Sequence, residues 1–134
     1  EYDKEFNYAE VTLNTSTIPI EAHEKMFGHK VNKGKTGATF NKDDQAKYVG
    51  MGWISVEKVD GVRKFIGNVL YKVKFSEPSE DYSTKGDSIE YKTPSITGRA
   101  IANEDGDWKD FEAFDASEDA LKWINTKFGK VEGL

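Results

Sequence analysis

Residues 48–76, YVGMGWISVEKVDGVRKFIGNVLYKVKFS, decide the fold, because two β-rich runs flank the dipeptide Asp60-Gly61. An Asp-Gly pair suits a type I′ turn, in which both central residues need positive φ, so the stretch predicts a β-hairpin. In residues 48–59, β-forming side chains occupy both faces, which predicts a central strand. In residues 62–76, large apolar side chains alternate with lysine and asparagine, which predicts one core face and one solvated or shared face.

Upstream of the hairpin, the sequence predicts a strand, a short helix and a long loop. Apolar and polar side chains alternate in residues 7–14, which predicts a half-buried strand. The helix follows Pro19, whose fixed φ suits a first helical turn, and runs to about Phe27, where a glycine can form the left-handed cap. Residues 29–45 are mostly polar and predict a loop with one short strand near Thr39. The helix stripe predicted to face the core consists of Ile20, His23 and Phe27.

Downstream, the polar residues 77–87 predict an exposed arm without regular structure. Residues 88–103 predict a long strand, and Pro94 within it predicts an edge position or a bulge, because proline cannot donate to the strand ladder. A turn and a short strand, residues 108–114, precede a C-terminal helix that ends at Gly129. The residues predicted to define this helix are the capping pair Asp115 and Glu118 and the buried stripe Leu121, Ile124 and Phe128.

Composition narrows the class of protein. The 134 residues suit one domain, 1–134, that can bury a substantial core. There is no cysteine, which excludes disulfides, thiolate nucleophiles and cysteine-ligated zinc. A formal net charge of −5 disfavours binding to nucleic acid or to anionic membranes, and no apolar run approaches the roughly 20 residues that span a bilayer. We therefore expect a soluble protein without a membrane partner.

The order of elements predicts the fold class. Runs of antiparallel strands with two helices set against them are typical of an α+β fold rather than of repeated βαβ units. We expect an antiparallel β-sandwich or partly rolled sheet with one short helix and one C-terminal helix.

No set of reactive side chains predicts an enzyme. The two histidines, His23 and His29, do not share a helix face, so we expect one on the apolar stripe and one in the following loop rather than a metal site. Residues 103–107 are rich in oxygen but lack the spacing of a calcium loop. The Gly34-Lys35-Thr36 run lacks the spacing of a phosphate-binding loop. We expect no catalytic residues, no cofactor and no metal.

The tryptophans leave a second function open. Trp53, Trp108 and Trp123 are candidates for a platform that stacks on sugar rings, as in a carbohydrate-binding β-sandwich module. We expect at least two of them to pack in the core instead, because Trp53 lies in the middle of a predicted strand and Trp123 beside a helix stripe.

Six segments succeed one another along nearly the whole chain: YAEVTLN, the helix IEAHEKMFGHKV, YVGMGW, the hairpin around DG, LYKVKFSEPSEDYSTKGDSIEYKTPSITGRA and a final aspartate-tryptophan turn. In their order and spacing they resemble the major tail protein, or tail-tube protein, of long-tailed, non-contractile phages of Gram-positive bacteria. The resemblance implies a tail-tube-like domain that closes into hexameric rings, which stack to form a conduit for DNA. It implies a structural function and no catalytic residues.

The same resemblance implies where the protein works and with what. The location is the tail of the virion, after assembly in the host cytoplasm, and the gene belongs to a phage or a prophage; a phage-derived bacteriocin or secretion tube shares the same assembly. The partners are copies of the protein and other tail proteins, while DNA passes through the lumen without specific binding.

Loops and arms are implied to contact neighbouring subunits and rings. The candidate contact residues are Lys33, Lys35, Thr36, Glu80, Asp81, Tyr82, Thr84 and Lys85. Members of the family generally carry a further N-terminal region, whereas this chain opens at Glu1. We therefore expect that an N-terminal segment of the full-length protein is missing and that this fragment is monomeric or weakly associated.

Overall fold

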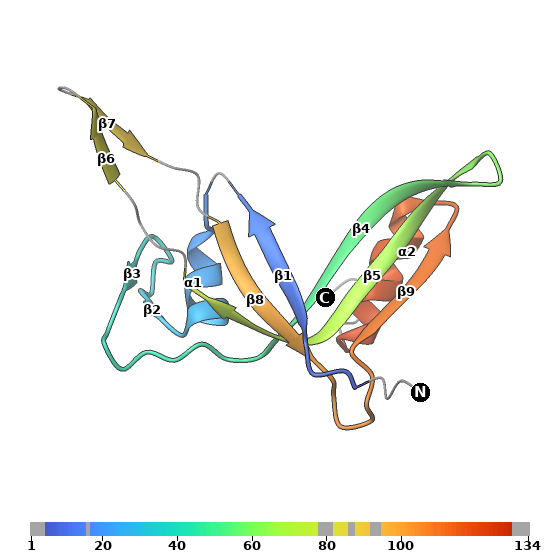
Figure 1. The fold of residues 1–134 in the computed structure, drawn as a ribbon, viewed down its shortest axis with the longest axis horizontal. Helices are drawn as coiled ribbons and strands as arrows, with labels where there is room; N and C mark the ends of the chain where they lie inside the picture. Colours follow the sequence, from blue (N-terminus) through green and yellow to red (C-terminus); the bar gives the residue numbers. More distant parts are fainter. Residues whose placement is uncertain (1–4, 16, 78–81, 86–87, 92–94, 130–134) are drawn as a thin grey trace. The chain divides into compact units, whose positions relative to one another are not determined.

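The fold is described by a computed structural model that covers residues 5–15, 17–77, 82–85, 88–91 and 95–129 (Figure 1). Its elements are β1 (Ala9–Asn14), α1 (Ile20–Phe27), β2 (Lys30–Val31), β3 (Ala38–Thr39), β4 (Val49–Val59), β5 (Val62–Ser76), β6 (Tyr82–Lys85), β7 (Ser88–Tyr91), β8 (Ser95–Ile101), β9 (Lys109–Phe114) and α2 (Ser117–Lys127). The helices, one short and one C-terminal, and the antiparallel strands confirm the predicted α+β class.

The chain divides into two compact units, which we name after their helices. The α1 unit comprises Tyr8–Val49 and Lys74–Arg99, and the α2 unit comprises Glu1–Asn7, Gly50–Val73 and Ala100–Leu134. The single domain expected for the whole chain stays a prediction. All three tryptophans belong to the α2 unit.

The central strand is β5 rather than β4. The strands of the main sheet follow the order β1-β8-β5-β4, and β9 also pairs with β5. The prediction that residues 48–59 form a central strand is therefore wrong, because β4 stands at the end of this order. In β5, the five consecutive residues 66–70 are all buried, which is the pattern of a strand covered on both faces. Of the two alternatives predicted for the second face, solvated or shared, the solvated one is wrong for the middle of the strand, where Asn68 is buried.

The hairpin itself forms as predicted. Asp60 and Gly61 have φ of 52° and 80°, the positive values that a type I′ turn requires. Along its other edge, β5 pairs antiparallel with β9, from Phe65 opposite Phe114 to Leu70 opposite Lys109. The buried apolar side chains among the described residues are Ile66, Val69, Leu70, Val73, Ala100, Ala120 and Ile124 in the α2 unit and Phe27, Phe75 and Ile96 in the α1 unit.

Glycines allow α2 to lie close to the hairpin. A Cβ atom on Gly52 would meet Ile124 at 2.5 Å, and one on Gly67 would meet Trp123 at 2.9 Å. The Trp123 ring also lies against Phe114, with 6.1 Å between ring centroids. Trp123 thus packs in the core, as expected for it.

The prediction for the start of α2 is wrong. The residue at the N-cap is Ala116, with no side-chain cap hydrogen bond, and Asp115 instead pairs with Lys64 of β5. The predicted stripe is only partly correct, because Leu121 is exposed while Ile124 is buried. Gly129 has φ of 75°, which agrees with the predicted left-handed end of the helix.

The α1 unit begins with the predicted strand and helix. Side chains of β1 alternate between half-buried and exposed. The helix α1 ends at Gly28, whose φ of 77° places it in the left-handed region, as predicted. Phe27 is buried, but Ile20 is exposed, so the predicted stripe is wrong at its first position. The strand expected near Thr39 is β3, and it pairs with β2, a short strand that was not predicted.

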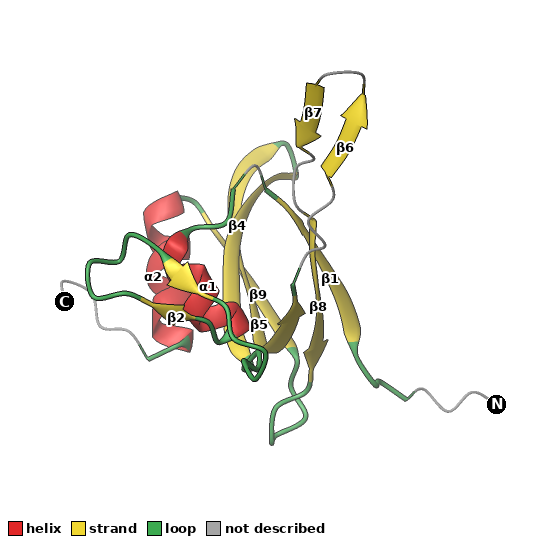
Figure 2. Cartoon of the chain, turned by 90° about the vertical axis from the view of Figure 1, so that its left-hand side faces the viewer, coloured by secondary structure: helices red, strands yellow, loops and turns green. Residues whose placement is uncertain are grey.

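Residues 77–103 contain more strands than predicted. The expected unstructured arm includes β6, which pairs with β7 in a two-stranded hairpin (Figure 2). The expected long strand is divided into β7 and β8, and Pro94 lies outside the described residues. In β8, exposed and buried residues alternate, and the strand lies between β1 and β5.

Candidate functional site

Three strands of the α2 unit bring distant residues onto one face of the sheet. Because the turn of the hairpin has two residues, Val59 lies opposite Val62 and, further along, Trp53 lies opposite Asn68. A hydrogen bond of 3.5 Å from the Asn68 amide to the Trp53 carbonyl oxygen agrees with this register. On the other side of β5, Asn68 lies opposite Phe111. Opposite residues share a face, so Trp53, Asn68 and Phe111 form a row across the three strands.

This row lies on the face away from α2. Gly52 and Gly67 face the helix, because their missing Cβ atoms would meet its side chains. Successive residues of a strand point to opposite faces, so Trp53 and Asn68, which follow these glycines, point away from α2. The helix therefore covers one face of the hairpin and leaves the other without a helix of its own unit.

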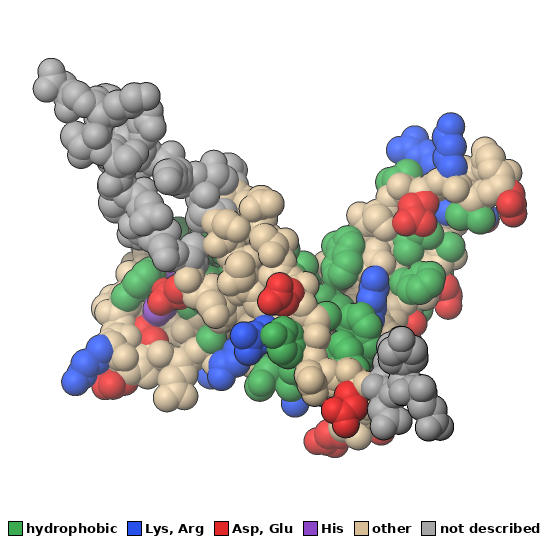
Figure 3. All heavy atoms as spheres, viewed as in Figure 1, with side chains coloured by type: hydrophobic (Ala, Val, Ile, Leu, Met, Phe, Trp, Pro, Cys, Tyr) green, Lys and Arg blue, Asp and Glu red, His purple; other side chains and the backbone are tan. Residues whose placement is uncertain are grey.

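Apolar side chains toward the edges and the turn of the uncovered face are exposed, whereas Ile66 and Leu70 in its middle are buried. The exposed fractions are 36% for Trp53, 44% for Val59, 53% for Val62 and 66% for Phe111, and we call these four residues the apolar sheet face. Asn68, between Trp53 and Phe111, is buried and donates its amide hydrogens to acceptors within the hairpin. Figure 3 shows hydrophobic side chains at the surface over these strands. Exposed large apolar side chains in one row of a sheet, such as Trp53 and Phe111, are typical of an interaction site.

The sheet also has free edges. Within the described residues, β1, β4 and β9 each pair with another strand on one side only. The outer side of such a strand presents backbone N–H and C=O groups that a strand of another chain can pair with. A sheet of this kind is suited to being continued by a second polypeptide.

A polar network holds α2 on the covered face. The Tyr71 hydroxyl and the Lys127 ammonium both donate to Asp110 Oδ2, at 3.1 and 2.8 Å. The hydrogen bond from Lys127 lowers the pKa of Asp110 below its ordinary value, and that from Asp110 raises the pKa of Lys127. Burial, together with the bond to Asp110, raises the pKa of Tyr71. These groups thus stay paired at neutral pH and keep the helix on its own face.

Three of the predicted contact residues lie together in the turn between β2 and β3. Asn32 organises this turn: its Oδ1 accepts the backbone N–H of Thr36 at 2.8 Å, and its Nδ2 donates to Thr36 Oγ1 at 3.0 Å. Lys35 has a positive φ of 55° and pairs with Glu21 at 3.5 Å. Lys33 is exposed. The turn thus presents both lysines at the surface of the α1 unit.

The other predicted contact residues are only partly described. Glu80 and Asp81 lie outside the described residues, whereas the backbone of Tyr82, Thr84 and Lys85 forms β6. Tyr82 pairs with Tyr91 and Lys85 with Ser88. Their role as contacts stays a prediction.

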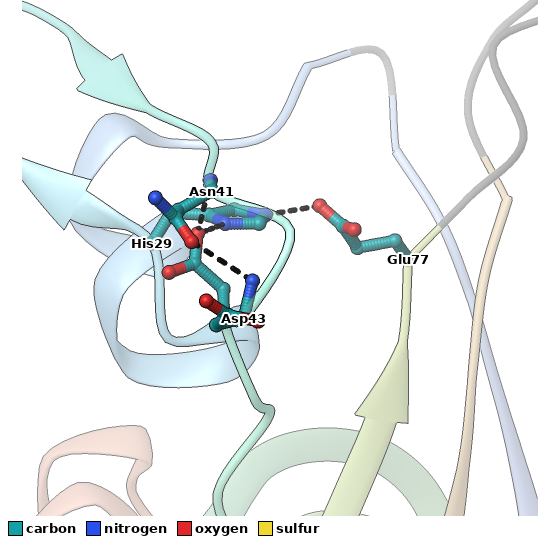
Figure 4. Close-up of polar contacts among 5 residues, drawn as sticks. His29, Asn41, Asp43 and Glu77 are labelled. Carbon is teal, nitrogen blue, oxygen red and sulfur yellow. Dashed lines mark hydrogen bonds and ion pairs between the residues drawn. The ribbon is translucent and has the colours of Figure 1, made fainter.

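A buried cluster around His29 was missed by sequence reasoning. The ring is only 4% exposed; Nδ1 lies 2.6 Å from Asp44 Oδ2, and Nε2 contacts Glu77 Oε1 (Figure 4). Phe40 stacks on the imidazole, with 3.8 Å between ring centroids. The sequence placed His29 correctly in the segment after α1 but not in contact with these residues. The carboxylates lie 15 and 48 residues further along the chain, and no local motif connects them.

The contacts of His29 determine its electrostatics. Burial lowers the pKa of His29, but the hydrogen bonds to Asp44 and Glu77 outweigh burial and raise the pKa above the ordinary 6.5. The hydrogen bond to His29 in turn lowers the pKa of Asp44. Because both ring nitrogens contact carboxylates, neither is free to take a proton from a nucleophile. Among the described residues, no three histidine, aspartate or glutamate side chains are grouped so as to hold a metal ion.

Two further predicted features have local explanations. In the oxygen-rich segment 103–107, Asn103 Oδ1 accepts the backbone N–H groups of Asp105 and Asp107, which is the geometry of an Asx turn. Trp108 stacks on Phe6, with 4.6 Å between ring centroids. Trp53 alone contradicts the expectation of core packing that its mid-strand position suggested, since it is on the exposed part of the hairpin.

Neither described helix is long and apolar enough to cross a membrane. Comparison of the chain with protein-family models, with curated proteins and with solved structures finds no match. The features of the chain that bear on its function are the apolar sheet face, the free strand edges and the resemblance in sequence.

Proposed function

We propose that this protein is a structural subunit of a phage or prophage tail tube, in which copies of the chain form hexameric rings that stack into a conduit for DNA. The observation that carries the proposal is the apolar sheet face, because aromatic and β-branched side chains exposed on a sheet suit association with another polypeptide. The free edges of β1, β4 and β9 support it, since they allow a sheet to continue between subunits. The resemblance of the six segments implies the kind of assembly, namely stacked hexameric rings.

The charge of the chain suits a conduit. With a net charge of −5 per copy, a wall of many copies repels DNA phosphates, so DNA passes through without specific binding. The turn with Lys33, Lys35 and Thr36 and the β6–β7 hairpin serve in this proposal as contacts with neighbouring rings. The partners are copies of the protein and other tail proteins, and the function requires no cofactor.

The direct test is electron microscopy of the natural gene product at raised concentration. Stacked rings with sixfold symmetry are the expected result. Compact single particles at every concentration, together with a monomeric mass by light scattering, would contradict the proposal. A bacteriocin or secretion tube derived from a phage would give the same images, and the neighbouring genes distinguish it from a phage tail.

The apolar sheet face gives a sharper prediction. Phe111→Glu places a charge on the most exposed member of this face, and we expect the yield of rings or tubes to fall more than about tenfold. The reason is that a charge buried without a partner at an interface costs about 2 kcal/mol or more, and 1.4 kcal/mol is a factor of ten. Assembly is measured by light scattering and sedimentation, and folding by circular dichroism.

Leu121→Glu is the matched control. Leu121 is 52% exposed, but it lies on α2, on the covered side of the hairpin. We expect this variant to assemble normally. Equal assembly of both variants, with both folded, would remove the apolar sheet face from the proposal.

One observation favours the carbohydrate-binding alternative, namely the exposure of Trp53 in the same row as Phe111. A pair of aromatic rings on a sheet suits stacking on a sugar. The other two tryptophans are engaged, Trp108 with Phe6 and Trp123 against Phe114. Binding on a glycan array that is lost in Trp53→Ala and kept in Trp108→Ala and Trp123→Ala would favour this alternative over the tube.

A further inference from the structure

The cluster around His29 joins segments that are far apart along the chain. His29 follows α1, Asp44 lies between β3 and β4, and Glu77 directly follows the last residue of β5. All three belong to the α1 unit. Figure 4 shows the contact between His29 and Glu77, and the Asp44 carboxylate contacts the other ring nitrogen. Glu77 is also the last described residue before β6, so the cluster holds the point at which the chain leaves the main sheet toward the β6–β7 hairpin.

The two contacts together require a particular protonation state. A neutral imidazole has one N–H donor and one acceptor nitrogen, whereas an ionised carboxylate only accepts hydrogen bonds. With a carboxylate at each nitrogen, the neutral ring would place a lone pair against one of the two carboxylates. Both contacts are therefore satisfied together when the ring is the imidazolium, which has two N–H donors.

The two carboxylates are not held equally. Asp44 is 18% exposed, and its Oδ2 also accepts the backbone N–H of Asn41 at 2.7 Å. Glu77 is 46% exposed at the end of a strand. When only one contact can remain, the one to Asp44 is the better supported, and the one to Glu77 is lost.

We propose that His29 is a proton-controlled latch, in which the imidazolium ties Glu77 at the end of β5 to Asp44 and loss of its proton releases Glu77. The latch lies in one unit and uses residues outside the apolar sheet face. It is therefore independent of the proposed function, and either can fail without the other.

Side chains of α1 and of the segment after β3 also lie near the His29 ring. From α1, His23 and Phe27 each lie with 6.0 Å between their ring centroids and that of His29. The buried Nδ1 of His23 has no hydrogen-bond partner among the described residues. A proton on His23 would oppose one on His29, whereas Phe27 and Phe40 carry no charge. The stabilising groups in contact with the ring are thus the two carboxylates.

The direction of the pH effect follows from the raised pKa of His29. A group whose pKa is higher in the closed state contributes its full stabilisation below its ordinary pKa of 6.5. That stabilisation is lost as the pH rises through the higher pKa of the closed state. The latch is therefore closed in mild acid and opens toward alkaline pH.

The test combines two measurements on the whole chain between about pH 5 and pH 9, the range around an ordinary histidine pKa. Nitrogen NMR of labelled histidine follows the protons on both ring nitrogens of His29. Amide hydrogen exchange, corrected for the intrinsic effect of pH, follows the opening of the backbone from Lys74 to Glu77. We expect both nitrogens of His29 to carry protons at pH 6.5. The opening constant should be flat below this pH and then rise by about tenfold per pH unit up to the pKa of the closed state.

Two variants separate the latch from general effects of charge. Glu77→Gln keeps the size of the side chain and an acceptor oxygen but removes the charge, so the pKa of His29 should fall and the pH dependence of opening should weaken. Glu57→Gln, at an exposed position of β4 in the α2 unit, should change neither. A His29 that titrates at or below 6.5, or exchange that does not depend on pH in the unsubstituted protein, would overturn the proposal.

Discussion

Replacing Gly28 with alanine is expected to destabilise the α1 unit by about 3 kcal/mol, from two causes that act together. Gly28 ends α1 with φ of 77°, a conformation that costs a residue with a side chain about 1 to 2 kcal/mol. In addition, a Cβ atom there would collide with the backbone carbonyl of Gln45, which cannot rotate away as a side chain would. Urea denaturation followed by circular dichroism measures the loss, and amide hydrogen exchange assigns it to α1 and β2.

Gly129→Ala is the control for this prediction. Gly129 follows α2 with φ of 75°, almost the same as Gly28, but no atom of the described residues lies within 4 Å of the position that a Cβ atom would take there. The cost of the backbone conformation alone, about 1 kcal/mol, is expected there. If the two alanine variants lost the same free energy of unfolding, the close approach of Gln45 would not matter.

Asn68→Asp is expected to destabilise the α2 unit by about 3 to 5 kcal/mol at neutral pH. The Asn68 side chain is 6% exposed, and its Nδ2 donates to the Ile66 carbonyl oxygen at 3.1 Å, to Ser55 Oγ at 3.2 Å and to the Trp53 carbonyl oxygen. A carboxylate would replace these donors with a buried negative charge beside two carbonyl oxygens. Urea denaturation at pH 7 measures the effect.

The pH dependence of this variant is a second check. Burial disfavours the charged carboxyl, so its pKa in the folded state lies above that in the unfolded chain. The destabilisation should therefore be complete above the folded pKa and should diminish as the pH falls through it. Asn68→Leu, which has a similar volume and no charge, should be less destabilising at pH 7 and should show no such recovery. A loss for Asn68→Asp that is equal at pH 4 and pH 7 would contradict the argument.

The parts of the fold that were predicted correctly depend on neighbours in the sequence. Asp60-Gly61, the left-handed glycines after both helices and the alternation in β1 need only local backbone preferences. Which strand is central depends instead on pairing between segments that are far apart in the sequence. β4 has β-forming residues on both faces, but its place at the end of the strand order is fixed by which strands pair with β5, and no local pattern shows that.

The same dependence on distant residues explains which features of the candidate sites were visible in the sequence. The position of Lys33, Lys35 and Thr36 in a turn is visible in the sequence as a polar segment. Their role as contacts stays a prediction. His29 was not recognised, because its partners Asp44 and Glu77 are ordinary acidic residues until the fold brings them together. The exposure of Trp53 was also missed, since an aromatic residue in the middle of a strand usually packs in the core.

The distribution of tryptophan has a practical consequence for spectroscopy. Trp53, Trp108 and Trp123 all belong to the α2 unit, and the α1 unit has none. Tryptophan fluorescence, excited at the red edge of the absorption band, therefore reports on the α2 unit. The α1 unit, which contains the His29 latch, contributes no tryptophan emission. A fluorescence melting curve of this protein would miss any event confined to α1, β2 and β3.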